Sequence, residues 1–85
     1  MATAADLDKA DVQLKASDAA YTAARGNAAA AERRLKELRS SDASPERLAQ
    51  QQAKLDAANA ELKTTGTAYQ AATDNWKTTY DAIPT

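Results

Sequence analysis

One stretch decides the fold: LAQQQAKLDAANAELKTTGTAYQAATDNWKTTYDAI, residues 48–83. Its large apolar side chains recur at every seventh residue without a break, at Leu48, Leu55, Leu62, Tyr69, Trp76 and Ile83. Three residues after each of the first five lies a side chain that is small or polar, namely Gln51, Ala58, Thr65, Ala72 and Thr79. This seven-residue repeat is typical of a coiled-coil helix, in which the first set occupies the a positions and the second the d positions.

The first half of the chain carries the same repeat. Its a positions are Leu7, Leu14, Tyr21, Ala28 and Leu35, and its d positions are Ala10, Ser17, Ala24, Ala31 and Leu38. The pattern therefore predicts two helices, roughly 4–40 and 45–82, joined by a turn at about 41–44. Residues 7–24 and 55–72 also match at nine of eighteen positions, which fits either an internal duplication or chance likeness between two Ala-rich heptad segments.

Helix-start signals support these boundaries. Ser44 followed by Pro45 is typical of an N-cap and a first helical position. Thr3, with Asp6 three residues later, resembles a capping box in which Asp takes the place of Glu. Pro84 disfavours helix at the residue before it and so limits the second helix.

Folding the chain back at Ala43 brings residues whose numbers sum to 86 opposite one another. Leu62 then faces Ala24, and Leu14 faces Ala72, so that large side chains meet small ones. Such alternation lets two helices interdigitate without voids. The predicted fold class is all-α: a single domain over 1–85, folded as an antiparallel two-helix hairpin of coiled-coil type.

The composition predicts a thin core. Hydrophobic residues make up 44% of the 85-residue chain, and 23 of them are Ala. Since Ala buries little apolar surface, a lone hairpin of this sequence gains little from its seam. We therefore expect the hairpin to be packed into a larger helical bundle or assembly.

A second set of small residues follows each helix on the side away from the seam, at heptad positions c and f. The first stripe is Val12, Ala16, Ala19, Ala23, Gly26 and Ala30, and the second stripe is Ala53, Ala57, Ala60, Thr64, Thr67 and Ala71. Neither stripe contains a charge, whereas the flanking positions do. Small residues at this spacing let helix backbones approach closely, which predicts that the stripes are interfaces. The alternative is that Ala, the best helix former, fills a face exposed to water.

Two glycines and two aromatic residues stand out against this background. Gly in a helix interior usually marks a kink or a close approach. Gly26 lies in the first stripe, which favours close approach there, whereas Gly66 beside the seam fits either role. Trp76 and Tyr80 share one helical face and are candidate interface hot spots, although Trp76 also fits the core register.

Charge and residue types exclude most chemistry. The net charge is −1 and the chain has neither Cys nor His, so we expect no metal, no cofactor, no small-molecule substrate and no enzymatic activity. Residues 25–54 have a balance of +3 and the remainder −4. The segment ERRLKELR, residues 32–39, interleaves Arg with Glu and lacks an aromatic platform, which makes a nucleic-acid partner unlikely.

These features predict a non-enzymatic structural or assembly protein that associates with itself or packs on a larger particle. The chain resembles in outline the small secreted helical hairpins with a Trp-x-Gly turn, but its turn reads SSDASPE, so no family is assigned. The alternative is a coiled-coil adaptor or chaperone that binds one partner helix. Without a basic, apolar leader or a membrane span, we expect synthesis in the cytoplasm, followed in the assembly case by incorporation into a particle.

Overall fold

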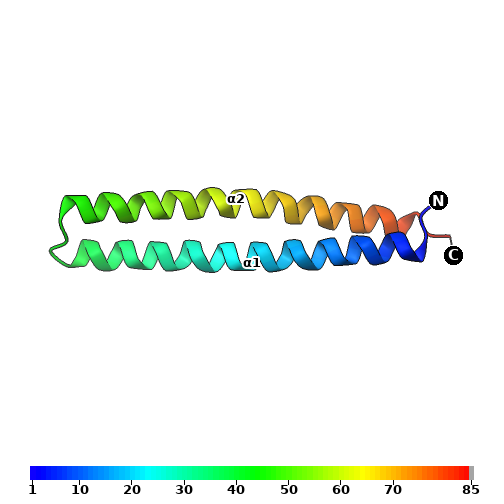
Figure 1. Ribbon diagram of the computed structural model, residues 1–85, viewed down its shortest axis with the longest axis horizontal. Coiled ribbons are helices and arrows are strands. Elements are labelled where there is room, and N and C mark those ends of the chain that lie inside the picture. Colours follow the sequence, from blue (N-terminus) through cyan, green and yellow to red (C-terminus); the bar gives the residue numbers. More distant parts are fainter. Residues whose placement is uncertain (85) are drawn as a thin grey trace.

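The computed structural model describes residues 1–84 and contains two helices, α1 (Ala4–Ser40) and α2 (Pro45–Asp81), each 37 residues long. The helices lie side by side in opposite directions, and the start of α1 and the end of α2 lie at the same end of the rod (Figure 1). The molecule measures 64 × 13 × 13 Å. This arrangement confirms the predicted all-α antiparallel hairpin, and its elongated shape fits the coiled-coil type.

Both helices begin at the residues that the sequence signals indicate. The Thr3 side chain accepts a hydrogen bond from the Asp6 backbone, and the Asp6 carboxylate accepts one from the Thr3 N–H at 2.9 Å, which completes the capping box. The Ser44 hydroxyl accepts from the Arg47 N–H at 3.2 Å. These bonds satisfy N–H groups that a helix start otherwise leaves without a partner.

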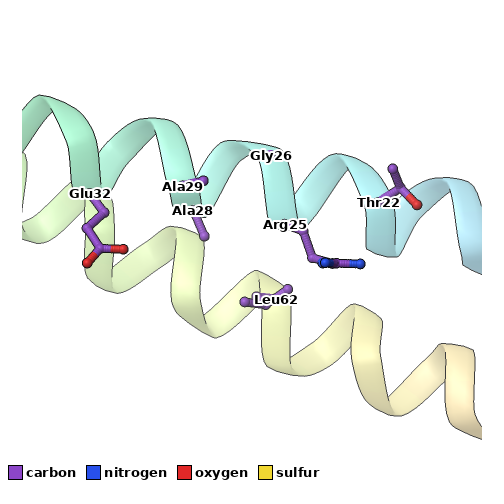
Figure 2. Close-up of a pocket in the computed structure, with 7 residues that line it drawn as sticks. All are labelled: Thr22, Arg25, Gly26, Ala28, Ala29, Glu32 and Leu62. Atoms are coloured by element: carbon purple, nitrogen blue, oxygen red, sulfur yellow. The ribbon is translucent and has the colours of Figure 1, made fainter.

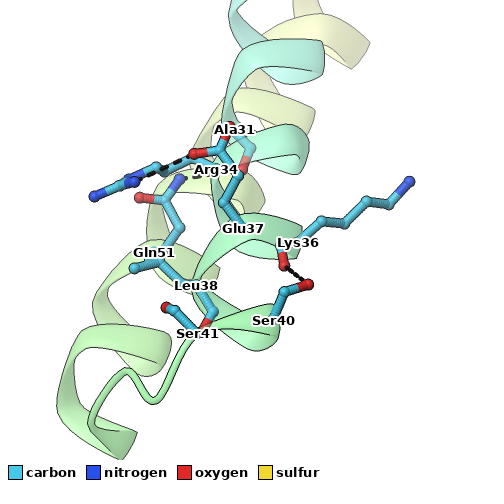
Figure 3. A network of polar contacts seen from close by, with 8 residues as sticks. All are labelled: Ala31, Arg34, Lys36, Glu37, Leu38, Ser40, Ser41 and Gln51. Carbon is cyan, nitrogen blue, oxygen red and sulfur yellow. Dashed lines mark hydrogen bonds and ion pairs between the residues drawn. The ribbon is translucent and has the colours of Figure 1, made fainter.

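The turn is closed by serine hydroxyls and contains no glycine. Ser40 donates its hydroxyl to the Lys36 carbonyl at 3.0 Å, and Ser41 donates to the Leu38 carbonyl at 3.1 Å (Figure 3). Ser41 itself has extended backbone angles, with φ −103° and ψ 166°. The chain therefore leaves α1 without a left-handed residue, which explains why no glycine is needed there.

The seam follows the predicted heptads. Every a and d position of both helices is buried or half-buried, and the buried ones are Ala10, Ala24, Ala28, Leu35, Leu38, Thr65 and Ala72. Five of these seven residues are small, and the two buried large residues, Leu35 and Leu38, lie near the turn at 3% and 7% exposed. No large side chain in the described part of the chain is fully buried, so the core is as thin as the composition predicts.

Two tyrosines meet across the seam. The rings of Tyr21 and Tyr69 stack with centroids 5.6 Å apart and planes 14° from parallel. An added Cβ at Gly66 would lie 3.2 Å from the Tyr21 ring, so Gly66 makes room for that ring. This contact settles the role of Gly66 as a close approach. At Gly26 an added Cβ would meet nothing within 4 Å, so a close approach there requires another chain.

Polar contacts between the helices follow the antiparallel register. Gln51, a d residue, donates its amide to the Ala31 carbonyl at 3.1 Å, inside the seam near the turn (Figure 3). Farther from the turn, the Asn75 side-chain amide donates a hydrogen bond to Gln13 Oε1 at 3.5 Å, and both residues occupy g positions. Like positions pair in an antiparallel coil because the two helices run in opposite directions.

Candidate interaction surfaces

All twelve residues of the two stripes are exposed in the single chain. Position f lies opposite the middle of the a/d seam on a helical wheel, and position c lies next to it. The first stripe on α1 and the second on α2 therefore face away from each other, on opposite long sides of the rod. Val12, the largest stripe residue, is 67% exposed, so nothing within residues 1–84 covers this end of the first stripe.

The two threonines of the second stripe have their hydroxyl protons occupied. Thr64 donates to the Ala60 carbonyl at 3.1 Å, and Thr67 donates to the Lys63 carbonyl at 3.0 Å. Threonines that bond back in this way offer a neighbour mainly their methyl groups. Both stripes are thus small, uncharged and largely apolar, which is the surface that close helix packing requires.

The stripes occupy the middle of the rod. Each spans eighteen residue steps, or about 27 Å at 1.5 Å per residue. Longer charged and polar side chains lie beyond both ends of each stripe, at Lys9 and Arg33 on α1 and at Gln50 and Asp74 on α2. A second helix could therefore approach closely over the middle third to half of the rod and would meet longer charged or polar side chains beyond it.

An open hollow runs beside the first stripe, along the side of the rod from Gly26 on α1 to Leu62 on α2 (Figure 2). Its lining comprises Thr22, Arg25, Gly26, Ala28, Ala29, Glu32 and Leu62. The Arg25 guanidinium lies 5.8 Å from the centre of the Tyr21 ring, a cation–π distance. The hollow is a shallow surface feature, unlike the enclosed apolar pockets that bind small molecules.

The aromatic pair near the chain ends combines a seam residue with an exposed one. Trp76 is half-buried at its a position, and the Tyr80 ring stacks on it with centroids 5.3 Å apart and planes 11° from parallel. Tyr80 remains 58% exposed. The structure therefore places Trp76 in the core register and leaves Tyr80 as the outer ring of the stack, open to a partner.

Charged side chains on α1 form only exposed pairs within the helix. Lys15 approaches Asp11 at 3.1 Å, and Lys36 approaches Glu32 at 3.7 Å. Arg34 lies 3.2 Å from Glu37 (Figure 3). Such pairs contribute little to stability because water screens them, and their partners can be exchanged at little cost.

The carboxyl group of Asp6 has a lowered pKa. The backbone N–H of Thr3, and then its hydroxyl, donate to the carboxylate and lower the pKa of Asp6 below its ordinary value. Hydrogen bonds to the charged form favour ionisation. The capping box therefore accounts for the shift.

Residues 1–84 contain no cluster of three or more His, Cys, Asp or Glu side chains that could hold a metal ion. Over the same range, neither helix is long and apolar enough to cross a membrane. Comparison of the chain with protein-family models, curated proteins and solved structures finds no match. The class that the fold defines is an antiparallel helical hairpin, and its function must be inferred from its own surfaces.

Sequence reasoning missed two contacts near these surfaces. One is the approach of the Tyr21 ring to Gly66, and the other is the bond from Gln51 to the Ala31 carbonyl. A glycine beside the seam was the available signal for the first. A glutamine in a d position, where apolar residues are usual, was the signal for the second.

Proposed function

We propose that this protein is a non-enzymatic structural or assembly component that associates with itself, or packs on a larger particle, through its two stripes. Small components of phage particles or of secretion apparatus are examples of this kind of protein. The observation that supports the proposal is that every stripe residue is uncharged and exposed, while the seam alone buries little. We further propose that the chain is made in the cytoplasm and assembles there.

The physical reason for association is the shortage of buried apolar surface. Exposed stripe residues such as Val12 and Ala19 leave apolar area in contact with water. Covering it stabilises the protein by about 25 cal/mol per Å². Small stripe residues add to this because they let backbones come close, so that many weak dispersion contacts form along the helices.

Sedimentation equilibrium at low micromolar concentration tests the proposal. We expect a mass above that of one 85-residue chain. Ala19→Glu with Ala23→Glu tests the first stripe, and Ala57→Glu with Ala60→Glu tests the second; at least one pair should disperse the assembly. A folded hairpin that remains strictly monomeric would contradict the proposal.

A matched control separates loss of the stripe from a simple change in charge. Ala49 and Ala68 are exposed, lie in α2 and fall outside both stripes. Ala49→Glu with Ala68→Glu adds the same charge with the same helix-forming residue, so this variant should keep the mass of the unaltered protein. Dispersion by the control would show that net charge, rather than the stripes, governs association.

The second candidate is a coiled-coil adaptor or chaperone that binds one partner helix. It is favoured by the incomplete burial of the large seam residues and by the exposed Tyr80 ring. A third helix along the groove would cover both. Such a protein would show weak helical circular dichroism alone and would gain helix when its partner is added. A self-associating chain would become helical without any added partner.

A further inference from the structure

The first stripe reads the same in both directions. Its residues are separated by four, three, four, three and four positions. When two copies of α1 lie antiparallel about a two-fold axis beside Tyr21, residues whose numbers sum to 42 face each other. Val12 then meets Ala30 of the second copy, Ala16 meets Gly26 of that copy, and Ala19 meets its Ala23. Every such layer pairs small with small, or the largest residue with an alanine.

The residues beside the first stripe carry complementary charges in this arrangement. The flanking positions are b and g, and in an antiparallel pair b faces b and g faces g. Asp8 and Lys36 are b residues, and Asp6 and Arg34 are g residues. Asp8 therefore lies opposite Lys36 of the second copy, and Asp6 lies opposite Arg34. The two-fold axis repeats each pair, which gives four attractive pairs at the two ends of the interface.

The structure leaves these groups accessible to a second copy, since Asp6 accepts the capping-box bonds from Thr3 on Oδ2 alone and keeps Oδ1 available. All four residues are exposed, and Asp8 forms no ion pair within residues 1–84. Asp8 and Lys36 stand 28 residues apart, about 42 Å along one helix, so they cannot meet within α1. The in-helix partners of Lys36 and Arg34 are exposed and easily exchanged. Lys9 falls opposite Arg33 just beyond the stripe, where both long side chains can turn into solvent.

Two other symmetric ways of pairing lack this complementarity. The same two-fold construction on the second stripe sets Glu61 against Glu61 and Lys63 against Lys63 at the axis. A parallel pairing of α1 places the acidic end of one rod on the acidic end of the other, and basic on basic. Like charges face to face disfavour both arrangements.

We propose that two copies of this chain dimerise through the first stripe, with their α1 helices antiparallel and with Asp8–Lys36 and Asp6–Arg34 pairs joining the copies. The interface is isologous, so it closes on itself and does not propagate. It leaves the second stripe exposed on both outer sides of the dimer, available to further neighbours. This inference rests on the proposed self-association and specifies its geometry.

Because the chain contains no cysteine, introduced thiols can report the geometry directly. Thr22 is exposed and lies at the axis, so Thr22→Cys should be cross-linked to its counterpart by a short bismaleimide. Ala29, also exposed and at the same heptad position, lies 14 residues from its counterpart in this dimer, about 21 Å away. Ala29→Cys should not be cross-linked, whereas a parallel pairing would cross-link both.

Charge reversal gives an independent readout. Lys36→Glu sets two acidic groups against each other twice, and should raise the dimer dissociation constant on the order of ten-fold at low salt. Asp8→Lys combined with Lys36→Glu recreates the attraction with reversed sign and should restore the original constant. Circular dichroism on each variant confirms that the helices are retained.

The outcomes distinguish the antiparallel dimer geometry from the more general proposal of self-association. Cross-linking at Thr22→Cys only, with rescue by the double reversal, supports the antiparallel dimer. Association that persists without cross-linking at Thr22→Cys, or with cross-linking at Ala29→Cys, overturns this geometry and leaves self-association intact. A strictly monomeric folded chain overturns both.

Discussion

Gly26 and Gly66 form a matched pair of substitution sites, because both lie inside helices and differ mainly in their surroundings. A helix-interior glycine costs about 1 kcal/mol relative to alanine. At Gly26 an added Cβ meets no atom within 4 Å. Gly26→Ala is therefore expected to raise the free energy of unfolding by about 0.5–1 kcal/mol.

The same change at Gly66 brings an opposing cost. An added Cβ would lie 3.2 Å from the Tyr21 ring, which is already stacked on Tyr69. The ring must shift, and an off-rotamer side chain costs about 0.5–1.5 kcal/mol. The gain in helix propensity and this cost nearly cancel, so Gly66→Ala should change stability little. The expected difference between the two variants is about 1 kcal/mol.

Thermal unfolding followed by far-UV circular dichroism measures that difference. For a domain of this size, 1 kcal/mol corresponds to a shift in Tm of about 4–8 °C. Since Gly26 faces a second copy in the proposed dimer, the comparison is made at the lowest concentration at which the chain is helical. A Tyr21→Leu background serves as the control, because without the ring Gly66→Ala should regain its full benefit. Equal stabilisation by both substitutions in the unaltered background would refute the reasoning.

Three further predictions concern the seam and the helix ends. A double-mutant cycle with Tyr21→Leu and Tyr69→Leu should give a coupling of about 0.5–1.5 kcal/mol in denaturant unfolding, and additive effects would show that the stacked rings do not support each other. Ser44→Ala should cost about 1 kcal/mol in the same assay, because the Arg47 N–H loses its acceptor; an unchanged midpoint would show that the cap is dispensable. The lowered pKa of Asp6 in the folded state means that its stabilising effect is complete above the unfolded pKa, about 3.9, and is lost as the pH falls through the folded value. The loss of this contribution on acidification therefore adds to the acid unfolding of the unaltered protein. Asp6→Asn should flatten the corresponding part of the curve of stability against pH.

The fold could be predicted from the sequence because its determinants are periodic or local. Heptads from Leu48 to Ile83 specify which face of α2 is buried, and Thr3 and Ser44 specify where the helices begin. The caps act through neighbours in the chain and the heptads repeat at a fixed period, so both can be recognised without knowledge of any tertiary contact. Every heptad seam position is accordingly buried or half-buried in the structure.

Contacts that depend on side-chain reach could not be predicted in the same way. The 86-sum register places Tyr21 opposite Thr65, yet its ring extends along the seam to stack on Tyr69 and to fill the space at Gly66. Gln51 likewise reaches the Ala31 carbonyl, in a neighbouring layer. A heptad assigns each residue to a layer, but the rotamer of a long side chain decides which neighbouring layer it contacts.

The candidate surfaces were visible in the sequence only as a pattern of small, uncharged residues. The structure shows that the twelve stripe residues are exposed within the chain. In the proposed dimer a second copy covers the first stripe and is aligned by charges such as Asp8 and Lys36, which stand 28 residues apart and cannot meet within α1.

The dependence of Tm on protein concentration tests most directly whether this hairpin is stabilised by association through its stripes. A species that binds only the folded chain stabilises it by mass action, so Tm should rise steadily as the concentration is raised about 100-fold through the micromolar range. The Ala19→Glu, Ala23→Glu variant should show a lower Tm with a weaker dependence on concentration. A Tm that is high and constant over the whole range would show that the hairpin is stable alone, and would contradict the account.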